Sequence, residues 1–242
     1  MKSYAHNHGN DVDDDDDYGN STAAMGNQKR HLTRGSKFEA RRNNTNTSNN
    51  VNDRKSSSTI AEICQLGLYD HNMLIYPDLS TFRKIYSECA KQALENNEIV
   101  LLITTYDSFD KVINSLTQAG VSVNDETRDG NLMVLDSIKA YQIDTYGVIK
   151  YVKTLDERLS RERKAGIFNI SDIGSFFVAE RIPTLVEYEQ NLTGKFDIPL
   201  KAICSYHIDD FVSLSHDQQE RILSAHNHVI DNNNNSRNYS QP

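Results

Sequence analysis

Several side chains that could bind a ligand stand where an apolar run of this sequence ends. Asp136 follows the run Leu132–Leu135, the position at which a Walker-B acid holds Mg²⁺ in phosphate-binding domains. An earlier run ends in the turn 76–81 (YPDLST), which has neither the glycines nor the lysine that would close on phosphates. Without that cradle a metal has little purpose here. We therefore expect Asp136 to cap the turn that follows it.

The histidines and cysteines do not form a recognisable ligand motif. His226 and His228 are two residues apart, so their side chains share a face only in a strand. No cysteine or carboxylate stands beside them to complete a ligand set, and we predict no metal site. Cys204 lies inside an apolar run, which favours a buried, inert thiol.

Glu187 and Glu189 flank Tyr188 and are the nearest approach to a paired acid and base. On a helix, residues two apart point to different faces, so we expect solvated or capping roles for both carboxylates. The sequence also has no Ser-His-Asp order, nucleophile elbow or HExxH. We therefore predict no catalytic residue, no cofactor and no enzymatic activity.

Composition divides the chain into three parts. Residues 1–60 are rich in Asp, Asn, Ser and Thr and contain few apolar side chains, so we expect a disordered arm. Residues 61–230 carry the apolar runs of a folded domain, and residues 231–242 resemble the arm in composition. The prediction is one domain with a disordered arm and tail.

The net charge of -8 lies on the predicted domain. Residues 63–230 contain 16 Lys and Arg against 24 Asp and Glu, which argues against a nucleic-acid surface there. Basic residues gather at 29–55, a segment that either contacts nucleic acid or an acidic partner, or is a solvated tail that binds nothing.

The three cysteines are widely spaced, which is typical of a reducing compartment. No apolar run reaches the length of a membrane helix, and the N-terminus does not resemble a signal peptide. We expect a cytoplasmic protein without membrane contact.

Strand and helix patterns alternate from about residue 60 onwards. Continuous apolar runs predict strands at 72–76, 98–105, 132–136, 167–174 and 200–206, with a last edge strand at 229–230. Helical periodicity predicts helices at 79–96, from 109 to Gly120, at 146–164 and within 179–192, while Val121 and Val123 suggest a short extended piece. This alternation predicts an α/β domain with a mostly parallel sheet between two layers of helices.

In such sheets ligands bind outside the carboxyl ends of the strands. The residues expected there, which we take as candidate ligand-binding residues, are Tyr76, Asp78, Tyr106, Asp136 and Tyr206. Ser171 and Asp172 end the fourth predicted strand and share this position.

Several short motifs, in their order and spacing, resemble those of the MEDS domain, the sensory domain named for methanogens, methylotrophs and the regulator DcmR. The motifs cover residues 68–230 and are His71 with Ile75-Tyr76, Asn97 to Leu101, Gly120-Val121, Gly130-Asn131-Leu132, Tyr141, Leu185 with Glu187-Tyr188-Glu189, and Cys204-Ser205-Tyr206. The resemblance implies a RecA/KaiC-like α/β domain that has lost its P-loop and senses small molecules.

The resemblance adds His71, Tyr141 and Cys204 to the candidate ligand-binding residues. An imidazole can donate and accept hydrogen bonds at neutral pH, and a phenol can orient a small polar ligand. The alternative is that His71 is a hydrogen-bonded residue at the start of its strand.

The resemblance implies a small-molecule sensor whose protein partner is a kinase or a transcription regulator. Two other functions stay open: a degenerate nucleotide-binding domain, and a DNA-associated regulator that uses the basic arm.

Overall fold

The structure is a computed structural model, and it describes residues 42–142, 144–192 and 196–233, without the side chains of residues 42–53 and 142. All of these residues belong to one compact unit, 41–242. The predictions for residues 1–41 and 234–242 lie outside the described residues.

A single parallel sheet of six strands forms the middle layer, in the order β3-β2-β4-β5-β1-β6. The strands are β1 (His71–Tyr76), β2 (Ile99–Thr104), β3 (Leu132–Asp136), β4 (Ile167–Asp172), β5 (Leu200–His207) and β6 (His228–Asp231). Every residue of β1, β2 and β4 is buried, as expected for strands covered on both faces. The predicted α/β fold class is confirmed.

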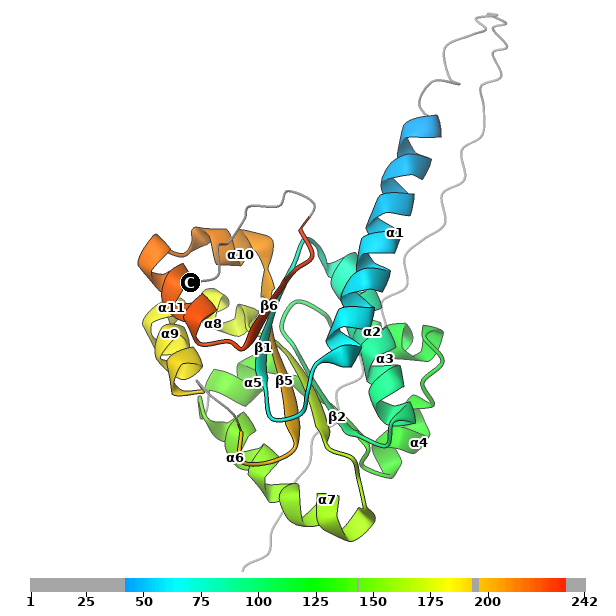
Figure 1. Ribbon diagram of the computed structural model, residues 1–242, viewed down its shortest axis with the longest axis vertical. Coiled ribbons are helices and arrows are strands. Elements are labelled where there is room, and N and C mark those ends of the chain that lie inside the picture. Colours follow the sequence, from blue (N-terminus) through cyan, green and yellow to red (C-terminus); the bar gives the residue numbers. More distant parts are fainter. Residues whose placement is uncertain (1–41, 143, 193–195, 234–242) are drawn as a thin grey trace, which may run out of the picture. The chain divides into compact units, whose positions relative to one another are not determined.

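Four of the described helices cover one face of the sheet: α1 (Arg42–Gln65), α2 (Leu79–Glu95), α3 (Phe109–Gln118) and α4 (Val123–Arg128). Seven described helices belong to the other face: α5 (Ser137–Gln142), α6 (Gly147–Thr154), α7 (Asp156–Glu162), α8 (Gly174–Val178), α9 (Ile182–Asn191), α10 (Ile208–Ser213) and α11 (His216–Ser224). Figure 1 shows α1 to α4 on one side of the strands and α8 to α11 on the other.

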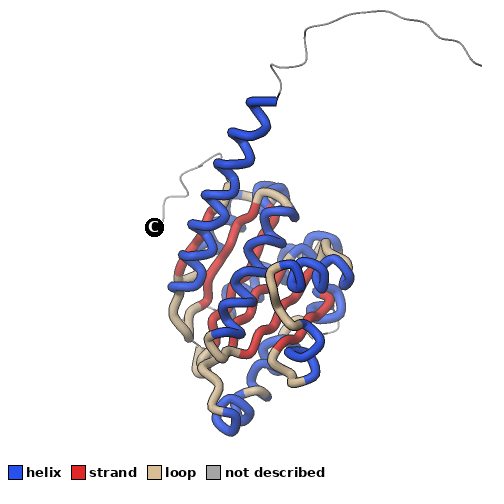
Figure 2. The backbone as a smooth tube through the Cα atoms, turned by 90° about the vertical axis from the view of Figure 1, so that its right-hand side faces the viewer, coloured by secondary structure: helices blue, strands red, loops and turns tan. Residues whose placement is uncertain are grey.

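Successive side chains along each strand point to opposite faces of the sheet and pack into two separate hydrophobic cores. In β1, Leu74 and Tyr76 pack with α2, whereas Met73 and Ile75 pack against the α5 to α11 layer. Figure 2 shows the strands running behind α1 and α2. A side chain on any central strand is therefore enclosed by helices, and polar side chains there need internal partners.

Two predicted elements differ from the structure. The piece at Val121 and Val123 is not extended: Val123 begins α4, whose first turn carries Asp125 and Glu126, favourable charges at a helix N-terminus. The single helix predicted for 146–164 is interrupted at Leu155, where the chain turns between α6 and α7.

The described helix α1 begins at Arg42, although the ordered region was expected from about Ile60. Its last turns rest on the domain, because Ile60 and Ile63 are buried in the same core as α2. Thr59 and Ser56 are also buried, so part of the expected arm is packed.

Candidate functional site

The eight predicted ligand-binding residues fall into three places. Tyr76 and Tyr106 lie at the carboxyl edge of the sheet, while Asp78 and Asp136 are helix caps. The other four are buried under the α5 to α11 face and are His71, Tyr141, Cys204 and Tyr206. The structure thus separates two polar sites that the sequence treats as one.

The first site lies between the ends of β2 and β4. The chain leaves β2 for α3 on one face and leaves β4 for α8 on the other, so the two loops diverge at this point. Such a switch point is where open parallel sheets bind ligands.

Asp172, at the end of β4, is the centre of this edge site and is only 1% exposed. Its carboxylate accepts hydrogen bonds from the backbone N–H groups of Gly174 at 3.0 Å and Thr105 at 3.3 Å. Burial raises the pKa of Asp172 to about 7, although the backbone N–H groups of Gly174, Thr105 and Tyr106 oppose the shift. Near neutral pH this carboxyl can therefore either donate or accept a hydrogen bond.

Two tyrosines flank Asp172. Tyr76 is fully buried and stacks on Phe82, with ring centroids 4.3 Å apart. Its pKa is raised by burial and by the nearby Asp172 carboxylate, and its hydroxyl makes no close hydrogen bond within the described residues. Tyr106 is partly exposed, and its hydroxyl donates a 2.8 Å hydrogen bond to Asp210 after β5. The edge site therefore joins the carboxyl ends of four neighbouring strands, β2, β4, β5 and β1.

The second site is a buried cluster of four side chains, His71, Glu189, Cys204 and His226, called the His–Glu–Cys cluster below. Nε2 of His71 lies 3.3 Å from Sγ of Cys204 and 3.2 Å from Oε2 of Glu189. Nε2 of His226 lies 3.5 Å from the same Oε2, and the four potential ligand atoms all lie within 4.8 Å of one another.

Four separate elements supply this cluster. His71 starts β1 and Cys204 lies within β5, while α9 contributes Glu189 and the turn after α11 contributes His226. Strands β1 and β5 are paired with Met73 opposite Cys204, which places His71 and Cys204 on the same face of the sheet. In Figure 1, α9 and α11 lie together on the side of the sheet opposite α1.

Hydrogen bonds hold the cluster from outside. The hydroxyl of Tyr206 donates to Oε1 of Glu189. Nδ1 of His71 lies 3.2 Å from the carbonyl of Ala225, and Nδ1 of His226 lies 2.7 Å from the carbonyl of Ile222. Burial acts to raise the pKa of Glu189, but the imidazoles of His226 and His71 outweigh it and leave that pKa lowered.

The solvated or capping role predicted for Glu189 is wrong, because its side chain is fully buried. The periodicity of α9 carries a signal for this: Glu189 is three and four positions after the buried Val186 and Leu185, whereas Glu187 is exposed. The prediction that His226 lacks a cysteine and a carboxylate is also wrong. The sheet and α9 bring both from distant positions.

The two remaining aspartates are caps. Asp78 lies in the turn after β1. Its carboxylate accepts a 2.9 Å hydrogen bond from the backbone N–H of Thr81, which makes Asp78 the N-cap of α2. Asp136 accepts the backbone N–H of Lys139 at 3.0 Å, so the predicted capping of the turn 137–140 is confirmed.

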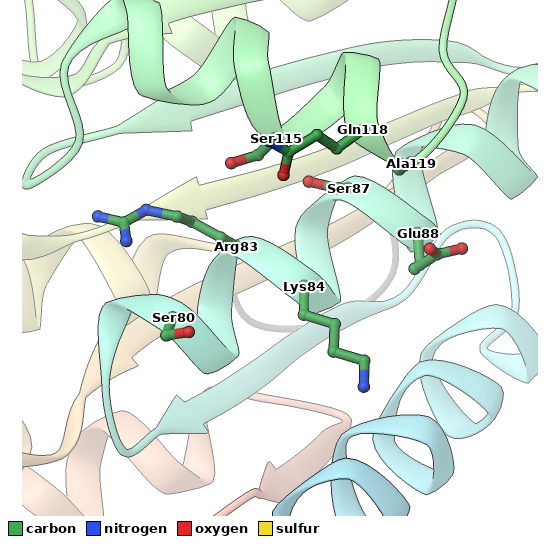
Figure 3. A pocket seen from close by; sticks show the side chains of 8 residues that line it. All are labelled: Ser80, Arg83, Lys84, Ser87, Glu88, Ser115, Gln118 and Ala119. Atoms are coloured by element: carbon green, nitrogen blue, oxygen red, sulfur yellow. The ribbon is translucent and has the colours of Figure 1, made fainter.

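A surface hollow of about 300 Å³ lies between α2 and α3. Figure 3 shows Ser87 of α2 facing Ser115 and Gln118 of α3, while Lys84 points away from α3. The residues that line the hollow are mostly polar, and none of them belongs to the edge site or to the His–Glu–Cys cluster. The hollow therefore adds nothing to the candidate sites.

Two further expectations concern the basic segment and membrane contact. The basic segment 29–55 lies partly outside the described residues, and its described part belongs to α1. Within the described part of the chain, each helix is too short or too polar to span a membrane.

Fold and sites together define a single-sheet α/β domain with an internal polar cluster and a polar switch point. The model of the MEDS family, the methanogen/methylotroph DcmR sensory domain, matches residues 70–227, from the start of β1 to the end of the turn after α11. The chain belongs to this family of sensory domains. A comparison with curated proteins finds no match to this chain.

Proposed function

We propose that this chain is a non-enzymatic sensory domain that binds a small polar molecule at the edge site and signals to a protein partner. The observation that carries the proposal is the buried Asp172 at the β2/β4 switch point. A buried carboxyl that can donate or accept, beside the buried Tyr76 hydroxyl, suits a ligand with a hydroxyl, carbonyl or amine group.

The contacts around the site support transmission of a signal. Tyr106 lies against Gly174 at the start of α8 and is hydrogen-bonded to Asp210 in α10. A ligand that competes for Asp172 or displaces Tyr106 would alter the positions of α3, α8 and α10 together. We propose that a kinase or a transcription regulator reads this change, as the family's sensory role suggests.

The geometry of the His–Glu–Cys cluster argues against a hydrolase. In a catalytic triad the nucleophile and the orienting acid contact opposite nitrogens of the histidine. Here Cys204 and Glu189 both approach Nε2 of His71. Burial also raises the pKa of the Cys204 thiol, which disfavours the thiolate.

The start of α2 argues against nucleotide binding. A phosphate at this helix N-terminus would need its free backbone N–H groups, but the carboxylate of Asp78 already accepts from Thr81. Calorimetric titration with Mg²⁺-ATP should show no binding. Micromolar affinity would overturn the sensor assignment in favour of a degenerate nucleotide-binding domain.

The direct test of the ligand site is native mass spectrometry of the protein purified from its own cells. We expect a small molecule to be retained by the wild type and by the Asp136→Asn control, but lost from Asp172→Asn and Tyr76→Phe. Retention by all four proteins, or by none, would reject the edge site. Proteins that co-purify with the wild type would identify the partner.

A further inference from the structure

We propose that the His–Glu–Cys cluster is a binding site for a divalent transition-metal ion of the zinc class. Its ligands would be Nε2 of His71, Nε2 of His226, Oε2 of Glu189 and Sγ of Cys204. The inference stands apart from the proposed function, because these residues are distinct from the edge site around Asp172.

The spacing of the four atoms suits tetrahedral coordination. Zinc–ligand bonds of about 2.0–2.3 Å place neighbouring ligand atoms roughly 3.3–3.8 Å apart. The distances from His71 Nε2 to Cys204 Sγ and Glu189 Oε2 are 3.3 and 3.2 Å, and that from His226 Nε2 to Glu189 Oε2 is 3.5 Å. All remaining pairs are within 4.8 Å, so small rotations of the side chains would close the set around one ion.

The hydrogen bonds of the two imidazoles orient them as metal ligands. A carbonyl oxygen can only accept, so the contacts with Ala225 and Ile222 require a proton on each Nδ1. Each neutral ring then turns the lone pair of Nε2 towards the cluster. An outer hydrogen bond from the non-ligating nitrogen to a backbone carbonyl is a common support of metal-bound histidine.

With both imidazoles neutral, the cluster lacks positive charge. Two Nε2 lone pairs and the Glu189 carboxylate face one another, and only the Cys204 thiol can donate among the four groups. Apart from the contacts of 3.2 and 3.5 Å within the cluster, Oε2 of Glu189 and Nε2 of His226 have no hydrogen-bond partner among the described residues. Both side chains are fully buried, so water cannot compensate them from bulk solvent.

A divalent ion would meet this deficit. Binding would form four metal–ligand bonds and release the thiol proton, leaving a dication with one carboxylate and one thiolate and hence no net charge. The mixture of imidazole, thiolate and carboxylate favours Zn²⁺ over Mg²⁺ or Ca²⁺, which prefer oxygen ligands. The competing account is a single extra proton on one imidazole, which would hold the cluster without a metal.

The outer residues are placed to keep the ligands in position. The Tyr206 hydroxyl binds Oε1 of Glu189 and leaves Oε2 for the ion. The turn that carries His226 is tied to β1, because the Asn227 backbone N–H donates to the His71 carbonyl at 2.7 Å, and His71 N–H donates to Oδ1 of Asn227 at 2.8 Å. Because the site is closed, metal loading should accompany folding.

The experiment refolds the full chain in the presence of Zn²⁺ or Co²⁺, removes free metal and measures the bound metal by mass spectrometry. We expect about one Zn²⁺ per chain in the wild type, falling below about 0.1 in Cys204→Ser and His226→Asn. Two matched controls should keep the ion: Cys89→Ser, a buried thiol under the opposite face, and His228→Asn, an exposed histidine.

A second measurement needs no variant and so does not depend on variants that fold. The Co²⁺ form of the wild type should show the intense visible bands of tetrahedral cobalt and a thiolate-to-cobalt charge-transfer band. Absence of the charge-transfer band, or equal metal content in the wild type and a folded Cys204→Ser variant, would overturn the site and favour the extra proton. Neither result would bear on ligand retention at Asp172.

Discussion

The backbone N–H of Thr105, just after β2, donates a 3.3 Å hydrogen bond to Oδ2 of Asp172, the last residue of β4. The Thr105 hydroxyl donates a second hydrogen bond, of 3.1 Å, to the Asp172 carbonyl. These bonds join two strands whose following helices lie on opposite faces of the sheet. They also keep a carboxyl group buried inside the protein, which makes the stability of the domain sensitive to pH.

Asp172→Asn should flatten that pH dependence. The pKa of Asp172 is about 7 in the folded protein against an ordinary value of 3.8, so the folded state holds its proton over this interval. Stability is therefore lost as pH rises from about 4 to about 7, by at most roughly 4 kcal/mol in the free energy of unfolding. Urea unfolding of wild type and variant across this range measures the difference. Parallel profiles would contradict the prediction, and exposed Asp136→Asn serves as control.

Gly174→Ala should destabilise the edge site. A Cβ at Gly174 would overlap the ring of Tyr106, so the ring must move and its hydrogen bond to Asp210 would be lost. We expect a cost of about 1–3 kcal/mol in the free energy of unfolding. In a Tyr106→Ala background the same change should cost much less. An equal cost in both backgrounds would show that Tyr106 is not the obstacle.

Asp78→Ala tests the assignment of Asp78 as a cap. Loss of the bond to Thr81 N–H should lower the free energy of unfolding by about 1 kcal/mol. Asp78→Asn retains an acceptor and should cost less, and Ser80→Ala, an exposed neighbour in α2, should be nearly neutral. Thermal or urea unfolding distinguishes these variants. Loss of a retained ligand in Asp78→Asn would instead place Asp78 in the ligand site.

Tyr206→Phe should destabilise the His–Glu–Cys cluster. It removes the donor to Oε1 of Glu189 in a place closed to water, and an unsatisfied buried acceptor costs about 1–3 kcal/mol. The matched control is Tyr146→Phe. The hydroxyl that this change removes accepts a 2.7 Å hydrogen bond from the Asn191 side chain near the surface. Urea unfolding should show a larger loss in the free energy of unfolding for Tyr206→Phe than for Tyr146→Phe. Equal effects would mean that Glu189 does not depend on Tyr206.

Most of the fold could be predicted because its strands are continuous apolar runs. The run 99–103, for example, favours burial on both faces, and the structure places it between β3 and β4 with every residue buried. The errors arise where local signals compete. Val121 and Val123 favour a strand, but the acidic first turn of α4 and burial of Val123 favour a helix. The likeness to RecA and KaiC stays a prediction.

The sites were less predictable, because their members come from distant parts of the chain. The sequence names His71, Cys204 and Tyr206 individually, yet nothing in it shows that they share one cluster with Glu189 and His226. Asp172 was one of several strand-end residues, and only its burial distinguishes it from the exposed Asp136. Periodicity indicates which face a side chain occupies, but not which other elements cover that face.

Local chemistry in the sequence thus determines the alternation of strands and helices, the absence of a phosphate cradle in the turn 76–81 and the caps at Asp78 and Asp136. These features depend on neighbouring residues. The pairing of β1 with β5, and the packing of α9 and the α11 turn over them, decide that two imidazoles, a carboxylate and a thiol converge. That convergence depends on long-range packing, in which residues over 150 positions apart become neighbours, and so only the tertiary structure reveals it.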